Sequence, residues 1–242
     1  MVNLVKLVPT VLKKEEASEE VAHQIATALL DPVPVLGLAT GSSVESVYRI
    51  LNGMVSASPE LRAGIQRTRC FALDEYVGLA PADPRSYRTT LEKQFAYPLG
   101  LSADRLHLPD EDSPEEFDVR IRNAGGVSIQ LLGLGANGHI GFNEPGSPLD
   151  STTRRVALAP RTRADNARFF ARKEDVPEEA VTQGIETILQ ARTIILLAFG
   201  KEKAEALRLA LAGPVSPDVP ASALQLHPNV RVFADTAAAQ LL

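Results

Sequence analysis

Apolar runs and amphipathic segments alternate along this chain. The apolar runs predict strands at residues 34–39, 69–76, 128–135, 193–200 and 230–235. Apolar residues at helical spacing predict helices at 15–30, 43–54, 86–95 and 201–213. Several of the strand runs are apolar throughout, as happens when helices cover both faces of a sheet. The pattern therefore predicts an α/β fold, a Rossmann-like and mostly parallel sheet with helices on both faces.

Length and composition indicate one domain with a sizeable core. The chain has 242 residues, of which 45% are hydrophobic. No internal repeat, linker or low-complexity segment divides the sequence. We therefore expect residues 1–242 to form a single domain.

Charge and targeting features exclude several classes of protein. The net charge is −5, and Lys and Arg are scattered among Asp and Glu, so no basic stripe invites nucleic acid. We find no signal peptide, and no apolar run approaches the roughly 20 residues of a membrane span. The single Cys70 lies in a predicted strand and cannot form an internal disulfide. These features predict a cytoplasmic protein without nucleic-acid or membrane partners.

A glycine-dense turn, LLGLGANGHIGFNEPG at 131–146, follows one of the apolar runs and carries ionisable groups. His139 is followed five residues later by Glu144, and Pro145 prevents regular helix there. A carboxylate beside an imidazole raises its basicity and fixes its tautomer, which suits acid–base chemistry. The alternative is a structural histidine in a turn. The formal GxGxxG match at 133–138 is accidental, because prolines interrupt the helix that a dinucleotide site needs.

The segment GLATGSSVESVYRIL, at 37–51, predicts a strand, a turn and a helix start. Free N–H groups at such a start, the helix dipole and the hydroxyls of Thr40, Ser42 and Ser43 can bind a phosphate. Ordinary N-capping by Ser42 or Ser43 is equally compatible with the segment. The lysine of a nucleotide-binding P-loop is missing, which excludes a Walker A site.

Two adjacent acids, Asp74 and Glu75, stand at the end of the predicted strand 69–76 in LDEYVGL. Side chains alternate along a strand, so one acid should face the crevice at the sheet edge and the other should face away. The acid in the crevice could act as a general base, whereas a solvated strand end is the plainer interpretation. Arg168 and Lys203 are further candidates, and each taken alone would be surface charge.

Together, GLATGSS, LDEYVGL, GANGHIGFNEPG and the Arg168 and Lys203 segments, in this order, resemble the glucosamine-6-phosphate deaminase family. The resemblance covers most of the chain. It implies conversion of glucosamine 6-phosphate to fructose 6-phosphate and ammonia without metal or organic cofactor. It also implies that Asp74 moves a proton between C2 and C1, and that His139 opens the sugar ring with help from Glu144 and Asn137. The resemblance assigns the substrate phosphate to Thr40, Gly41, Ser42, Arg168 and Lys203.

Two departures from the family pattern change these expectations. Many members have Asp where this chain has Asn137, so Glu144 is left as the anionic partner of His139. Regulated hexameric members have a basic residue where this chain has Val156, and they extend further than Leu242. We therefore expect an unregulated monomer that binds only a small sugar phosphate.

Two rival functions remain open at this stage. A lactonase of the same fold would use His139 as the base for water, without needing Asp74. A non-catalytic sensor would bind the sugar phosphate to control a partner.

Overall fold

The computed structural model describes residues 4–80, 82–170 and 172–242. Its centre is a seven-stranded sheet in the order β1-β10-β9-β6-β2-β3-β5, in which every neighbouring pair is parallel. The strands are β1 (Thr10–Val11), β2 (Val35–Leu38), β3 (Arg69–Ala72), β5 (Leu106–His107), β6 (Ile129–Gly133), β9 (Thr193–Ala198) and β10 (Val230–Ala234). The central strands β2, β6 and β9 are almost wholly buried, which explains why their sequences are mostly apolar, with Gln130 as a buried polar exception in β6.

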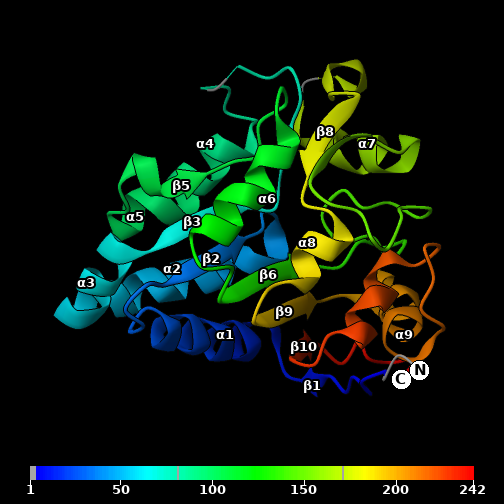
Figure 1. The fold of residues 1–242 in the computed structure, drawn as a ribbon. Coiled ribbons are helices and arrows are strands. Elements are labelled where there is room, and N and C mark those ends of the chain that lie inside the picture. The colour runs from blue at the N-terminus through cyan, green and yellow to red at the C-terminus, as the bar shows by residue number, and fades with distance from the viewer. Residues whose placement is uncertain (1–3, 81, 171) are drawn as a thin grey trace.

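Helices cover both faces of this sheet. They are α1 (Lys14–Ala28), α2 (Ser42–Ala57), α3 (Pro59–Arg67), α4 (Tyr87–Leu91), α5 (Tyr97–Leu99), α6 (Pro114–Asn123), α7 (Pro160–Asn166), α8 (Ile185–Leu189) and α9 (Ala204–Ala212). Helices α1 and α2 pack against each other on one face, and α6 and α8 lie over the other (Figure 1). The predicted α/β class, with its mostly parallel sheet, is confirmed. None of the helices in the described part of the chain is both long and apolar enough to cross a membrane.

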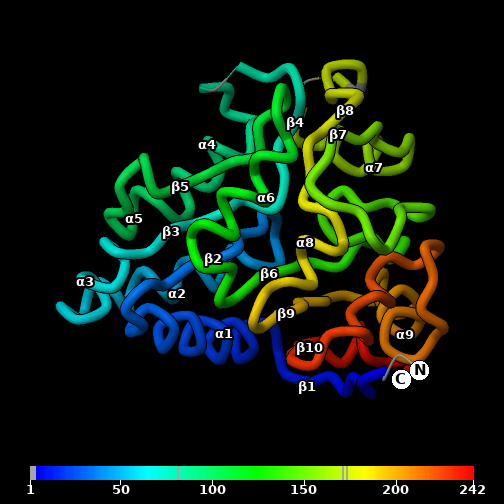
Figure 2. The backbone as a smooth tube through the Cα atoms, in the orientation of Figure 1, coloured from blue at the N-terminus to red at the C-terminus, as the bar shows by residue number. Residues whose placement is uncertain are grey.

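The prediction of one strand at 69–76 is wrong. The chain leaves the large sheet after Ala72, and β4 (Asp74–Tyr76) joins a second, antiparallel sheet in the order β4-β8-β7. Its other strands are β8 (Glu179–Thr182) and β7 (Arg154–Ala157), and Figure 2 shows β4 beside β8. Alternation of side chains is the same in both sheets, so the sequence pattern does not reveal where a strand changes partners.

The predicted helix at 86–95 is also interrupted. It begins as α4 and widens into a π-helical turn at Glu92–Ala96 before α5. Pro98 has no N–H to donate to the carbonyl of Gln94, so a regular α-helix cannot continue through this point. The predicted helix at 201–213 begins with a 3-10 turn, Lys201–Lys203, before α9.

The strand order of the large sheet creates a topological switch point at its carboxyl edge. From β2 the chain moves to β3 and β5 on one side, then crosses to β6, β9 and β10 on the other. The direction therefore reverses between β2 and β6, and ligands bind at such switch points outside the carboxyl ends of the strands. The segments after β2, β3, β6 and β9, which carry the candidate residues, all begin at this edge.

Candidate active site

Asp74 is the first residue of β4 and its side chain is only 6% exposed. Burial, and then the charge of Glu75, raise the pKa of this carboxyl to about 8. Within the described residues, no donor lies within hydrogen-bond distance of the carboxyl group. A carboxyl group that titrates near neutral pH is suited to act as a general base.

The small sheet turns Asp74 toward the glycine-dense loop. Asp74 pairs directly with Thr182, and Thr182 pairs with Arg154, so these three side chains share one face of the sheet. The Thr182 hydroxyl accepts the N–H of Phe142 at 3.1 Å, and Arg154 Nη1 donates to Asn143 Oδ1 at 2.8 Å. Phe142 and Asn143 both belong to the glycine-dense loop. The face of the small sheet that carries Asp74 therefore packs against this loop.

Glu75 points away from this face and anchors a helix. Its carboxylate accepts the N–H groups of Tyr87 at 2.9 Å and Arg88 at 2.8 Å, at the start of α4. Burial raises the pKa of Glu75, and these backbone bonds oppose that shift. The two adjacent acids therefore occupy different environments, one buried without a partner and the other held by a helix start.

His139, Asn137 and Glu144 form one hydrogen-bonded group in the loop. Asn137 Nδ2 donates to Glu144 Oε2 at 2.8 Å, and this bond orients the amide so that its Oδ1 lies 2.7 Å from His139 Nδ1. An amide oxygen only accepts, so His139 carries its hydrogen on Nδ1 and leaves Nε2 able to accept a proton. The distance from His139 Nδ1 to Glu144 Oε2 is 3.5 Å, so Asn137 connects the two ionisable groups.

The charge on Glu144 is stabilised from several sides. Burial alone would raise its pKa, but the interaction with His139 and hydrogen bonds from Thr162 and Asn137 lower it to about 2. Glu144 is therefore ionised at all physiological pH values. An anion at this position favours a transient positive charge on the His139 ring.

Backbone geometry fixes the loop against β8. Gly138 and Gly141 have positive φ angles of 87° and 56°, and a Cβ at Gly141 would lie 2.8 Å from Thr182 Oγ1. Asn143 Nδ2 donates to the Gln183 carbonyl at 2.8 Å, while the Gln183 N–H donates to the Leu73 carbonyl, also at 2.8 Å. The end of β8 thus connects the loop to the residue preceding Asp74.

Helix α2 begins at Ser42, and its N-cap is Gly41 with a φ of 97°. No side chain of the described residues caps this helix, so the predicted alternative of capping by Ser42 or Ser43 is wrong. Thr40 is half-buried, whereas Gly41 and Ser42 are exposed. The first N–H groups of α2 therefore remain available to an anion.

Lys203 and Arg168 come from two different turns of the chain. Lys203 is half-buried at the end of the turn after β9, and Arg168 lies in the 3-10 turn Ala167–Phe169 after α7. Burial lowers the pKa of Lys203, and the positive charge of Arg168 lowers it further. The negative charges of Glu202 and Asp165 oppose this shift. Arg168 is exposed, with its guanidinium 4.7 Å from the centre of the Phe169 ring. The two cations are thus close enough to influence each other.

Sequence reasoning missed Thr162, Thr182 and Gln183, which contact the site. Thr162 lies in α7 and donates its hydroxyl to Glu144 Oε1. Gln183 donates Nε2 to the Ala72 carbonyl at 3.0 Å, where β3 ends. None of the three belongs to a motif, and each approaches the site from an element distant in sequence, so no local signal could have identified them.

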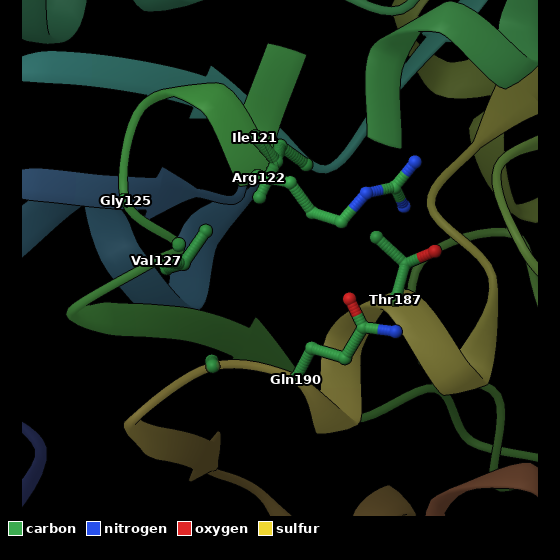
Figure 3. A pocket seen from close by; sticks show the side chains of 8 residues that line it. Ile121, Arg122, Gly125, Val127, Thr187 and Gln190 are labelled. Atoms are coloured by element: carbon green, nitrogen blue, oxygen red, sulfur yellow. The ribbon is translucent and has the colours of Figure 1, made fainter. Parts of the chain in front are cut away.

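A separate cavity of about 280 Å³ lies between α6, α8 and the amino end of β6 (Figure 3). Arg122, Val127, Thr187 and Gln190 line it with their neighbours. It includes none of the candidate residues. The predicted chemistry is therefore concentrated at the opposite, carboxyl edge of the sheet.

Comparisons with known proteins complete the description of the site. Residues 12–233 match the family described as glucosamine-6-phosphate isomerases/6-phosphogluconolactonase. The chain is 48% identical over 235 residues to the glucosamine-6-phosphate deaminase of Rhodopirellula baltica, covering 94% of this chain and 92% of that protein. It is 46% identical over 232 residues to the deaminase of Cutibacterium acnes, with 93% and 87% covered.

Solved structures agree with these relatives. A monomeric glucosamine-6-phosphate deaminase superposes with a TM-score of 0.91 at 40% identity, covering 98% of this chain and 100% of that one. The 6-phosphogluconolactonase of Trypanosoma cruzi superposes with a TM-score of 0.75 at 20% identity, covering 100% and 98%. The second likeness shows a shared fold alone.

Proposed function

The chain belongs to the family of glucosamine-6-phosphate isomerases and 6-phosphogluconolactonases, and within it we propose a glucosamine-6-phosphate deaminase. The reaction converts glucosamine 6-phosphate and water to fructose 6-phosphate and ammonia. The observation that carries this proposal is the pairing of a buried carboxyl of raised pKa, Asp74, with the His139–Asn137–Glu144 group on the facing loop. A sugar deaminase needs both a base for carbon and a group that opens the ring.

Ring opening is assigned to His139. Its Nε2 accepts the proton of the C1 hydroxyl and returns a proton to the ring oxygen, which leaves an aldehyde at C1 and the amine at C2. Asn137 holds the tautomer that this step requires. The Glu144 carboxylate stabilises the imidazolium that exists between the two transfers.

Proton transfer at carbon is assigned to Asp74. Its carboxylate removes the proton from C2 of the open chain and delivers it to C1. In the same isomerisation the C1 oxygen gains a proton and the C2 nitrogen loses one, so an alcohol forms at C1 and an imine at C2. Water then adds to C2 and ammonia leaves, giving the ketone of fructose 6-phosphate. Every step is a proton transfer, an addition or an elimination, so we expect activity to persist after treatment with a chelator.

The phosphate is assigned to the start of α2 together with Arg168 and Lys203. Unpaired N–H groups and the helix dipole favour a dianion there, and the two cations add charge-assisted hydrogen bonds. Thr40, Gly41 and Ser42 supply the backbone and hydroxyl donors. Among the described residues neither Lys203 nor Arg168 forms an ion pair within 4.0 Å, although the charges of Glu202 and Asp165 act on Lys203, so both cations can bind the phosphate.

We also infer a cytoplasmic monomer. The monomeric deaminase of known structure is similar over its whole length, and Val156 lies at a position where an anionic effector would need a positive charge. The sequence has a single cysteine, Cys70, which is buried and cannot form an internal disulfide, as is usual in a reducing compartment.

One assay tests the proposed function. Ammonia and fructose 6-phosphate are measured together from glucosamine 6-phosphate, and we expect equal amounts of both. Asp74→Asn is the control, because it should bind the substrate without turning it over. Hydrolysis of 6-phosphogluconolactone in place of deamination would indicate the lactonase, and binding without turnover by the unmodified protein would indicate a sensor.

A further inference from the structure

Helix α7 contributes a hydroxyl group to the carboxylate of the loop. Thr162 is 5% exposed, although Arg161, Ala164 and Asp165 around it are exposed. Its Oγ1 donates to Glu144 Oε1, since an ionised carboxylate can only accept. A buried threonine whose helical neighbours are exposed or half-buried, and whose hydroxyl is directed at a carboxylate, differs from an ordinary surface contact.

The two oxygen atoms of Glu144 are held by different parts of the chain. Asn137, in the same loop, donates to Oε2 at 2.8 Å, while Thr162 donates to Oε1 from α7. One bond alone would leave the carboxylate free to rotate about its last torsion, which is soft. With both oxygens bonded, Oε2 remains 3.5 Å from His139 Nδ1.

We propose that Thr162 is a positioning residue for ring opening, because it fixes the Glu144 carboxylate beside the Asn137–His139 pair. This inference rests on the proposed function. Thr162 does not touch the reacting atoms and acts through Glu144. Because this chain has a neutral amide at position 137, Glu144 is the residue that supplies negative charge to His139. The orientation of the Glu144 carboxylate is therefore more important than it would be with an aspartate at position 137.

Helix α7 also contacts β4, the strand that carries Asp74. Asn166 Nδ2, at the end of α7, donates to Tyr76 Oη at 2.8 Å, and Tyr76 lies on β4 with Asp74. Tyr76 also packs in a small apolar cluster with Phe142 of the loop and Phe170 after α7. Thr162 is thus presented to Glu144 by a segment with two further attachments, which limits its movement.

The test compares two buried threonines of equal exposure. Thr162→Val removes the hydroxyl that Glu144 accepts, and Thr187→Val is the matched control, because Thr187 is also 5% exposed but its hydroxyl has no partner in the described structure. A hydrogen bond to a charged group corresponds to roughly a 10- to 100-fold effect. We expect Thr162→Val to lower kcat within this range with KM changed less than about 3-fold, Thr162→Ser to recover most of the rate, and Thr187→Val to match the unmodified enzyme.

A second readout separates positioning from a purely structural role. Loss of the Thr162 bond should raise the pKa of Glu144, so the acidic limb of the kcat profile should move to higher pH in Thr162→Val alone. Titration of the Glu144 carboxyl carbon by NMR reports the same shift without requiring turnover. If Thr162→Val does not fold, Thr162→Ala is measured in the same way.

The outcomes distinguish this inference from the proposed function. An unchanged kcat profile and an unchanged Glu144 titration in Thr162→Val would overturn the positioning role. Equal losses in Thr162→Val and Thr187→Val would also overturn it. Absence of deaminase activity in the unmodified protein, with a shifted Glu144 titration in Thr162→Val, would refute the proposed function while preserving the contact.

Discussion

At the scale of single residues, Asp74 and Glu75 are neighbours with different surroundings. Asp74→Asn should lower turnover by about 10²- to 10⁴-fold while leaving substrate binding within a few-fold, because only the base is lost. Glu75→Gln should mainly lower stability, since its carboxylate accepts backbone N–H groups at the start of α4. Steady-state kinetics and thermal unfolding of both variants provide the measurement. An active Asp74→Asn protein and an inactive Glu75→Gln protein would reverse the assignment.

The raised pKa of Asp74 also predicts a cost in stability. Its value in the folded protein, about 8, lies above the ordinary 3.8, so the folded state holds the proton more tightly than the unfolded state. The stability that this proton provides is fully present below pH 3.8 and is lost as the pH rises through about 8. Asp74→Asn cannot ionise and should therefore be more stable than the unmodified protein at pH 9, by on the order of a few kcal/mol.

Urea unfolding at pH 4 and pH 9 measures this difference, which should shrink at the lower pH. Asp118 provides a matched control, because it is also 6% exposed but accepts the N–H of Thr153 at 3.1 Å. Asp118→Asn should lower stability by weakening that contact. A destabilised Asp74→Asn at pH 9 would show that the carboxylate has stabilising partners in solution.

At the scale of elements, the start of α2 should bind an inorganic anion. Crystals grown in phosphate or sulfate should hold the anion within hydrogen-bond distance of the N–H groups that follow Gly41. If Lys203 contacts the phosphate equally in the ground and transition states, Lys203→Ala should raise KM more than it lowers kcat. Lys201→Ala is the control, because Lys201 lies in the same turn but is exposed. An anion bound only elsewhere would contradict the assignment of the phosphate site.

The sequence predicts elements well where a whole run is buried. β2, β6 and β9 are buried on both faces and mostly apolar. The segments that follow them therefore start at one edge of the sheet, and these segments carry Thr40, His139 and Lys203. The small sheet was not predicted, because β4, β7 and β8 are short, and a short run does not specify its partner.

The candidate site likewise has one part that the sequence predicts and one part that depends on tertiary contacts. Strand ends and glycines in the sequence indicate the Asp74 and His139 segments. Thr162 and Gln183 reach the site only through tertiary contacts with Glu144 and Ala72. A hydroxyl or amide becomes functional through its neighbours, and its own sequence context contains no information about them.

At the scale of the whole molecule, we expect a monomer with hyperbolic kinetics and no response to N-acetylglucosamine 6-phosphate. An effector shifts an equilibrium only by its differential affinity for two states, and Val156 offers no charge to an anion. Light scattering and substrate titrations, with and without the effector, test this. A sigmoidal curve that the effector makes hyperbolic would contradict it and would show that other residues bind the effector.

The pairing of β4 with β8 has a consequence for biosynthesis. Asp74 is made early, yet Thr182, its partner across the small sheet, leaves the ribosome only when most of the chain has been translated. Until then the carboxyl is hydrated and has its ordinary acidity, because nothing has withdrawn it from water. A partly synthesised chain therefore lacks the carboxyl group of raised pKa. We therefore expect the chain to become catalytically competent only late in synthesis, when β4 pairs with β8.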